Sequence, residues 1–165
     1  MPISTTTIGS GTAETGVTTD VTNLQTLTEL QGAQAGDYAG LAMSADGERI
    51  VAALEFRGTN YDFAGSVWYS LDGGQSWTQS DAPLAYYGGL ACDDAVKHCA
   101  AAPGGDPSWN DAMMVTSCDG GSSWTSSPPL ASWTTAVTVN GDGGRMVVGR
   151  YKNGAHALYS FPLAV

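Results

Sequence analysis

The chain has 165 residues, of which 42% are hydrophobic and only 13% are charged, and its formal net charge is −10. This length suits one domain with a hydrophobic core. With six Lys and Arg in total, the first of them Arg49, the composition argues against binding to nucleic acid or to an anionic membrane surface. No apolar run reaches the length of a transmembrane helix, and Met1-Pro2-Ile3-Ser4 does not begin a signal peptide. The sequence predicts no membrane insertion and leaves the compartment, including secretion after processing, open.

The N-terminal segment, residues 1–37, has ten Thr among its first 30 residues and no Lys or Arg. Thr and Val favour strands, so residues 21–27, Val-Thr-Asn-Leu-Gln-Thr-Leu, predict an outer strand. Residues 31–36 are predicted to connect it to the following repeats. We expect residues 17–30 to supply the strand that completes the last of the following repeats, either in the same chain or in its neighbour.

Three stretches align without a gap, each with two apolar runs around a turn: residues 41–53, 90–102 and 137–149. The offsets between them are 49 and 47 residues. In this alignment each stretch opposes two apolar residues at the same position, namely Met43 and Ile50, Cys92 and Cys99, and Val139 and Met146. Small residues in continuous apolar runs are typical of strands covered on both faces. Each stretch therefore predicts an inner β-hairpin.

One eight-residue motif occurs twice, at residues 70–77 and, 47 residues later, at 117–124. The copies read Ser-Leu-Asp-Gly-Gly-Gln-Ser-Trp and Ser-Cys-Asp-Gly-Gly-Ser-Ser-Trp. Asp-Gly-Gly suits a hairpin turn, because Gly reaches positive φ freely and Asp accepts hydrogen bonds from the amides of its own turn. Each copy follows a short apolar run and precedes a polar one. The motif therefore predicts a strand, a tight turn and a returning strand whose Trp covers the turn.

Both copies match the Asp-box, Ser-x-Asp-x-Gly-x-x-Trp, at every defined position. The chain thus resembles the Asp-box, or bacterial neuraminidase repeat (BNR), β-propeller proteins, which include sialidases, other glycosidases and lectins. The resemblance implies that the box is an element of the fold lying away from the active site. Its structural residues are then Ser70, Asp72, Gly74, Trp77, Ser117, Asp119, Gly121 and Trp124. The alternative makes Asp72 and Asp119 ligands or catalytic acids.

Each repeat combines an inner hairpin, a variable loop, a third strand, a box hairpin and a fourth strand, with the ~45-residue period of a propeller blade. We predict one all-β, β-propeller-like domain over residues 1–165, with about three four-stranded antiparallel blade units at 38–85, 86–131 and 132–165. The third is incomplete: Ser160 aligns with Ser70 and Ser117, but residues 161–163, Phe-Pro-Leu, replace the box. A ring needs at least about four blades. A chain with three blades must therefore self-associate, remain an open arc or be part of something larger. We expect self-association into a homodimer or a higher homo-oligomer, and we favour two chains that make a six-bladed ring.

The three cysteines are Cys92, Cys99 and Cys118. The repeat alignment places Cys92 and Cys99 on adjacent strands, where a disulfide is sterically possible. Two small buried thiols are the alternative. Without a CxxC motif or a nearby pair of histidines, a zinc site is poorly supported. We predict neither a metal nor a cofactor.

The loops that join strands two and three of each blade share one face of a propeller with the connections between blades. Here these are residues 55–66, 103–112 and 150–156, with connections near 80–88 and 126–135. They differ between repeats and gather aromatic side chains beside Asp, Asn and Arg, a mixture that suits carbohydrate. The candidate ligand-binding residues are Arg57, Asn60, Tyr61, Asp62, Tyr86, Tyr87, Asp106, Trp109, Asn110, Asp111, Trp133 and Arg150. The alternative for each aromatic is packing between blades.

A catalytic site is poorly supported. A sialidase gathers three arginines on the substrate carboxylate, but Arg49 and Arg145 lie at the opposite end of the blades from Arg57 and Arg150. Nothing in the spacing of the acidic residues selects the pair of carboxylates that a glycosidase needs. The two histidines, His98 and His156, are interpreted as surface residues. We expect a non-catalytic, lectin-like carbohydrate-binding protein; the alternatives are a structural or assembly protein and a glycosidase-like fragment.

Overall fold

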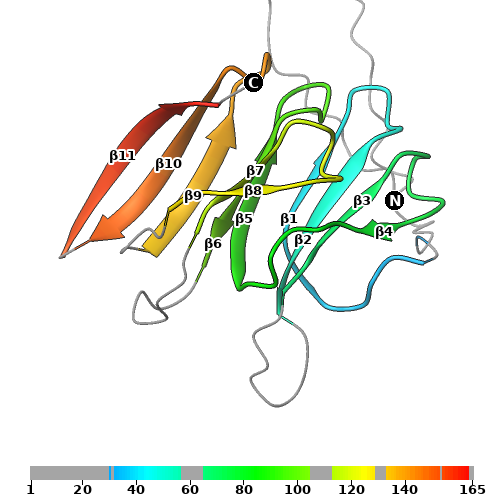
Figure 1. Ribbon diagram of the computed structural model, residues 1–165, viewed down its shortest axis with the longest axis horizontal. Coiled ribbons are helices and arrows are strands. Elements are labelled where there is room, and N and C mark those ends of the chain that lie inside the picture. Colours follow the sequence, from blue (N-terminus) through cyan, green and yellow to red (C-terminus); the bar gives the residue numbers. More distant parts are fainter. Residues whose placement is uncertain are drawn as a thin grey trace, which may run out of the picture.

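The computed structural model describes residues 30, 32–56, 65–104, 113–128, 133–152 and 154–163. These residues form eleven strands in three antiparallel sheets, which lie side by side in Figure 1. No helix in this part of the chain is long and apolar enough to cross a membrane. The predicted all-β class is confirmed for the described residues.

Each sheet, called a blade from here on, consists of consecutive strands. Blade 1 has the order β1-β2-β3-β4, blade 2 the order β5-β6-β7-β8, and blade 3 has three described strands in the order β9-β10-β11. The strands of blade 1 are β1 (Asp37–Met43), β2 (Ile50–Phe56), β3 (Val67–Ser70) and β4 (Thr78–Gln79). Those of blade 2 are β5 (Tyr87–Cys92), β6 (Cys99–Pro103), β7 (Val115–Ser117) and β8 (Thr125–Ser126). Those of blade 3 are β9 (Trp133–Val139), β10 (Arg145–Lys152) and β11 (Ala155–Pro162).

The inner hairpins have the predicted register. The pairs Met43–Ile50, Cys92–Cys99 and Val139–Met146 lie directly opposite each other on neighbouring strands. Each turn is closed in the same way, although the residue at the first turn position differs. The backbone N–H of the residue five positions later donates to Ser44, Asp93 or Asn140, over 3.0, 3.1 and 2.7 Å respectively. One structural role is thus filled by three residue types, each with a side-chain oxygen that accepts the bond.

The hydrophobic core lies in two layers between the blades. Side chains alternate between the faces of a strand. On β6, Cys99 and Ala101 therefore pack with Val51 and Ala53 of blade 1, whereas Ala100 and Ala102 pack with Val148 of blade 3. Blade 2 is consequently covered on both faces by its neighbours.

Blade 3 departs from the predicted alignment by one residue. In blades 1 and 2 the serines Ser70 and Ser117 oppose Ile50 and Cys99. In blade 3 Phe161 opposes Met146, which is equivalent to Ile50 and Cys99, and Ser160 is shifted to Val147. The equivalence of Ser160 to Ser70 and Ser117 was therefore wrong. No serine closes a box turn at this position. β11 therefore remains a regular strand over its full length of 8 residues, from Ala155 to Pro162.

The third variable loop was also predicted incorrectly. Residues 150–156 were expected to form a loop, but β10 extends to Lys152 and β11 begins at Ala155. Arg150 opposes Ala157, and Lys152 opposes Ala155, so the two strands are paired through most of this segment. The expected closing strand at 17–30 lies outside the described residues apart from Leu30, so it stays a prediction.

Candidate functional site

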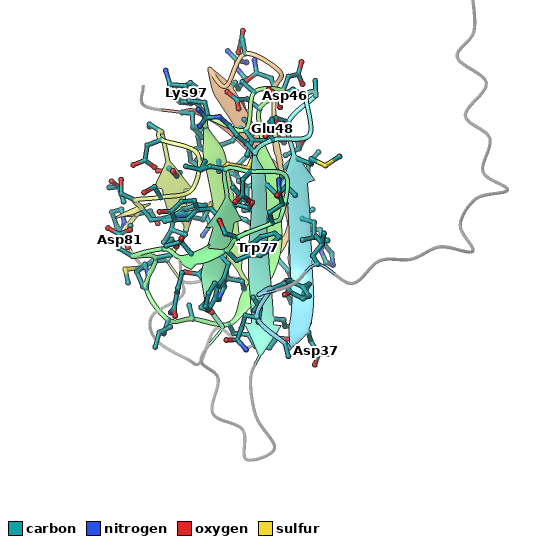
Figure 2. The ribbon with its side chains drawn as sticks, turned by 90° about the vertical axis from the view of Figure 1, so that its right-hand side faces the viewer. Asp37, Asp46, Glu48, Trp77, Asp81 and Lys97 are labelled. Atoms are coloured by element: carbon teal, nitrogen blue, oxygen red, sulfur yellow. A yellow bond between two sulfur atoms is a disulfide. The ribbon has the colours of Figure 1, made fainter. Side chains whose placement is uncertain are left out.

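The blades have two opposite ends, which can be followed in Figure 2. We call the end that carries Asp46, Glu48 and Lys97 the turn end, because the inner turns and the two box motifs lie there. The opposite end, near Asp37, is the loop end, where β2 and β6 terminate and the connections between blades begin.

The two box motifs at the turn end have the same hydrogen bonds. The hydroxyl of Ser70 donates to Asp72 over 2.8 Å and accepts the backbone N–H of Gly74 over 2.8 Å. The carboxylate of Asp72 also accepts the N–H and the hydroxyl of Ser76, over 2.9 and 2.5 Å. The indole N–H of Trp77 donates to the carbonyl of Gly74 over 3.1 Å. The carboxylate is thus engaged by its own turn.

The second motif repeats this arrangement. Ser117 donates to Asp119 over 2.9 Å, and Asp119 accepts the N–H and the hydroxyl of Ser123 over 2.9 and 2.5 Å. Trp124 donates its indole N–H to Gly121 over 2.8 Å. Hydrogen bonds from Ser76 and Ser70 hold the pKa of Asp72 at about 2. Partial burial opposes the shift at Asp119, yet the hydrogen bonds still leave its pKa below the usual value. Both carboxylates are arranged as ionised turn acceptors.

The inner turn of blade 2 holds a disulfide between Cys92 and Cys99. In the same turn, Val96 has a φ of 49°, where the equivalent residues of blades 1 and 3, Gly47 and Gly143, are glycines. A β-branched residue is strained in this region, but the Val96 side chain is fully buried in the layer between blades 1 and 2. Burial of the side chain and the covalent link across the hairpin both favour this turn.

His98 lies in the interior, contrary to the expectation of a surface residue. Its side chain is buried, and Nδ1 lies 2.7 Å from the carboxylate of Asp93. Burial opposes the shift, but the bonds from His98 and from the amides of Lys97 and His98 lower the pKa of Asp93. Gly143 of blade 3 covers this pair so closely that an added Cβ would lie 2.3 Å from Nδ1. This burial could not be predicted from the local sequence pattern, because it depends on Gly143 of the neighbouring blade.

At the loop end, glycines allow backbone segments to approach one another closely. A Cβ on Gly65 would lie 2.2 Å from the carbonyl oxygen of Leu54 and 2.4 Å from that of Ala85. A Cβ on Gly104 would lie 2.5 Å from the ring of Tyr86. The amide of Gly104 donates to the carbonyl of Tyr86 over 2.8 Å. These contacts fix the connection between blades 1 and 2 against the ends of both blades.

Tyr86 contacts both blade 1 and blade 2 at this end. Its ring packs on Gly104 at the end of β6, and its hydroxyl donates a hydrogen bond to Glu55 near the end of β2. Both side chains are half-buried. The hydrogen bond to Glu55, with a smaller effect of burial, raises the pKa of Tyr86, so the phenol is a neutral donor at neutral pH. The pair joins blades 1 and 2 where the two variable loops begin.

The remaining described candidates are distributed differently. Tyr87 is fully buried and donates its hydroxyl to the carbonyl of Pro83 over 2.5 Å, so it belongs to the core and cannot contact a ligand. Arg150 lies on β10, with its guanidinium 5.2 Å from the ring centre of Tyr159. Trp133 begins β9, opposite Tyr151. Both residues therefore belong to blade 3.

The other predicted ligand residues fall in the segments 57–64 and 105–112, outside the described residues. They are Arg57, Asn60, Tyr61, Asp62, Asp106, Trp109, Asn110 and Asp111. The hydrogen bond between Glu55 and Tyr86 was not predicted, because the two residues are 31 positions apart in the sequence. The described residues contain no group of three or more His, Cys, Asp or Glu placed to hold a metal ion.

Comparisons with known proteins give matches only at the level of structure. No protein-family model matches the chain, and no curated protein sequence is significantly similar to it. A GH74 xyloglucanase from Xanthomonas campestris superposes with a TM-score of 0.55 at 16% identity, over 81% of this chain and 22% of that one. A GH74 enzyme from Niastella koreensis gives 0.52 at 15% identity, over 74% and 20%.

The β-propeller domain of Cps50 (Swd1) from Myceliophteria thermophila gives a TM-score of 0.50 at 18% identity, over 84% of this chain and 45% of that domain. The chain thus spans less than half the length of each of these solved structures. At such low identity the likeness concerns the fold alone. Together with the three aligned blades, it shows that the chain has the fold of β-propeller blades.

Proposed function

We propose that the chain is a non-catalytic, lectin-like Asp-box propeller protein that binds neutral carbohydrate at the loop end of blades 1 and 2. The observation that carries the proposal is the hydrogen-bonded Glu55–Tyr86 pair. It presents a half-buried aromatic ring beside a carboxylate, at the place where both variable loops begin. Sugars are bound by this combination, since ring faces pack on C–H groups and carboxylates accept hydroxyl protons.

The charge of the protein supports a neutral ligand. The net charge is −10, and the carboxylate of Glu55, one of the 16 acidic side chains, lies at the proposed site. An acidic sugar would meet repulsion there unless arginines compensated it. The candidate residues of the loops, among them Trp109 and Tyr61, would enlarge the apolar platform on which a neutral sugar ring could pack.

Binding is tested with an array of neutral and acidic glycans, followed by calorimetry on the best ligand. The series should include xyloglucan fragments, because one structurally similar protein is a xyloglucanase. We expect Tyr86→Ala to weaken binding about 10-fold or more, because it removes the aromatic contact. Tyr86→Phe keeps the ring and should retain most of the affinity. Leu84→Ala, an exposed residue two positions away, is the matched control.

The same preparations distinguish the alternatives. If the wild-type protein released reducing ends from a glycan and the Glu55→Gln variant did not, the protein would be a glycosidase and not a lectin. Absence of binding to every glycan on a broad array would refute carbohydrate recognition and favour a scaffold that contacts other proteins. Binding that survives Tyr86→Ala unchanged would place the carbohydrate site elsewhere on the molecule.

A further inference from the structure

The two outer faces of the blade row are exposed where the equivalent inner faces are covered. On blade 1, Leu41 opposes Ala52 and Met43 opposes Ile50, so these four residues share the face turned away from blade 2. Leu41 and Met43 are each 65% exposed. Their equivalents in blade 2, Leu90 and Cys92, are half-buried against blade 1. The positions that blade 2 buries against blade 1 are therefore exposed to solvent in blade 1 itself.

The approach to blade 1 has the geometry of a connection between blades. Between blades 1 and 2, the Tyr87 hydroxyl donates to the carbonyl of Pro83. In front of blade 1, the equivalent Tyr38 donates its hydroxyl to the carbonyl of Gln34. Tyr87 is fully buried, but Tyr38 is 40% exposed. Blade 1 thus has the local structure of a blade that follows another one, without the covering that a preceding blade provides.

A pocket of about 640 Å³ marks the uncovered face. It is lined by Leu41, Met43, Ile50 and Trp77 of blade 1 and by residues of the segment 33–36. Leu30 reaches into it and contacts Gly74. The equivalent glycine of blade 2, Gly121, is contacted instead by Val51 of blade 1. Leu30 therefore occupies the position that a residue equivalent to Val51 would take if another blade preceded blade 1.

The outer face of blade 3 has the residues that would supply that covering. Val147 opposes Thr138 and Ser160, and Gly149 opposes Ala136 and Leu158, so these residues share the face turned away from blade 2. Val147 and Gly149 are equivalent to Val51 and Ala53, which cover blade 2. Leu158 is 78% exposed. Blade 3 thus presents the type of face on which a following blade packs.

We propose that a second copy of this chain covers these faces head to tail, with blade 3 of each copy packed on blade 1 of the other. Such a junction continues the interface already present between blades 1 and 2 and between blades 2 and 3. Val147 of the second copy would take the place of Leu30 over Gly74. Two copies give six blades, within the four to eight that are typical of closed propellers, whereas three copies would exceed them. The two junctions are related by a twofold axis.

The test uses the full chain and measures its mass in solution by light scattering. Wild type should have twice the chain mass. Leu41→Asp on blade 1 and Leu158→Asp on blade 3 should each weaken association at least ~30-fold, because each places a charge in both junctions. Leu84→Asp is the control, since Leu84 is also 62% exposed but lies on neither outer face. It should remain a dimer.

Mixing the two monomeric variants gives the decisive measurement. Leu41→Asp retains an intact blade 3 face and Leu158→Asp an intact blade 1 face, so a head-to-tail contact predicts a complex of one chain of each. Restoration of the complex also shows that both variants are folded. A monomeric wild type at micromolar concentration would overturn the proposal. A Leu158→Asp variant that dimerises as well as wild type would also refute it, because it would indicate contact between two blade 1 faces.

Discussion

The turn end and the loop end of the blades use polar groups in opposite ways. At the turn end, Asp72, Asp119 and Asp93 accept hydrogen bonds from their own turns, and few of their acceptor positions are left for a ligand. At the loop end, a side-chain hydrogen bond joins Glu55 of blade 1 to Tyr86, which directly precedes the first strand of blade 2. Polar groups that are engaged within one turn stabilise the fold, whereas a pair assembled between two blades can respond to a bound molecule. Substitutions at the turn end should therefore change stability and not binding, and those at the loop end the reverse.

The largest effect on stability is expected for Gly143→Ala at the turn end. The residue has a φ of 73°, and the new Cβ would lie 2.3 Å from Nδ1 of His98. Backbone strain and overpacking together should lower the free energy of unfolding by about 3 kcal/mol, measured by urea denaturation. Gly47→Ala is the matched control, with a φ of 78° at the equivalent turn and nothing within 4 Å. It should cost only about 1 kcal/mol; equal losses would show that the contact with His98 is unimportant.

Removal of the disulfide should have the next largest effect. Cys92 and Cys99 close a short loop, so the double substitution to Ala should lower the free energy of unfolding by about 2 kcal/mol. Carbohydrate affinity should be unchanged, because the bond lies at the turn end. In wild-type protein that is denatured without reductant, only the thiol of Cys118 should react. Three reactive thiols in oxidised material would contradict the bond.

The sequence predicted the parts of the fold that depend on local pattern. Apolar runs around a turn gave the three inner hairpins with their register, as Cys92 and Cys99 illustrate. The burial of His98 and Tyr87 could not be predicted in this way, because it depends on neighbouring segments that cover them. The Glu55–Tyr86 bond likewise joins residues of two blades. Only the register of β11 on β10 was predicted incorrectly, because Phe161 stands where a serine ends the equivalent strands of blades 1 and 2.

The loop end is tested by Trp109→Ala. Under the proposed function, loss of this indole removes an aromatic platform and should weaken binding of a neutral glycan by about 1–3 kcal/mol. The melting temperature should change little. Leu71→Ala is a suitable control, because Leu71 is an exposed apolar residue at the turn end, 56% accessible. If both variants lost affinity equally, the division of roles between the two ends would be incorrect.

Deleting residues 1–30 tests the predicted closing strand. If this segment completes blade 3 of a neighbouring copy, the shortened chain should lose self-association or aggregate. Light scattering at several concentrations measures either result. Unchanged dimerisation would show that packing between the blade faces is sufficient without the segment.

The smallest effect is expected for the box carboxylates. Asp119→Ala removes the acceptor for Ser117, Ser122 and Ser123 and should lower stability by about 1 kcal/mol at neutral pH, similar to the loss of a helix cap. Binding should be retained, because the turn lies away from the loop end. A variant with unchanged stability but lost binding would instead make Asp119 a ligand residue.

The pH dependence sharpens this last prediction. The pKa of Asp72 is about 2 in the folded chain, below the value of about 3.9 expected when unfolded. A carboxyl group with a lowered folded-state pKa stabilises the fold fully above the unfolded value, and this contribution is lost as the pH falls through the folded one. The pKa of Asp119 is lowered in the same direction. The difference in stability between wild type and Asp119→Ala should therefore be constant from pH 7 to about pH 5, and decrease as the pH falls below the unfolded-state pKa of about 3.9 and through the lower folded-state pKa. Urea denaturation at a series of pH values measures it, and a difference that grows on acidification would contradict the turn-acceptor role.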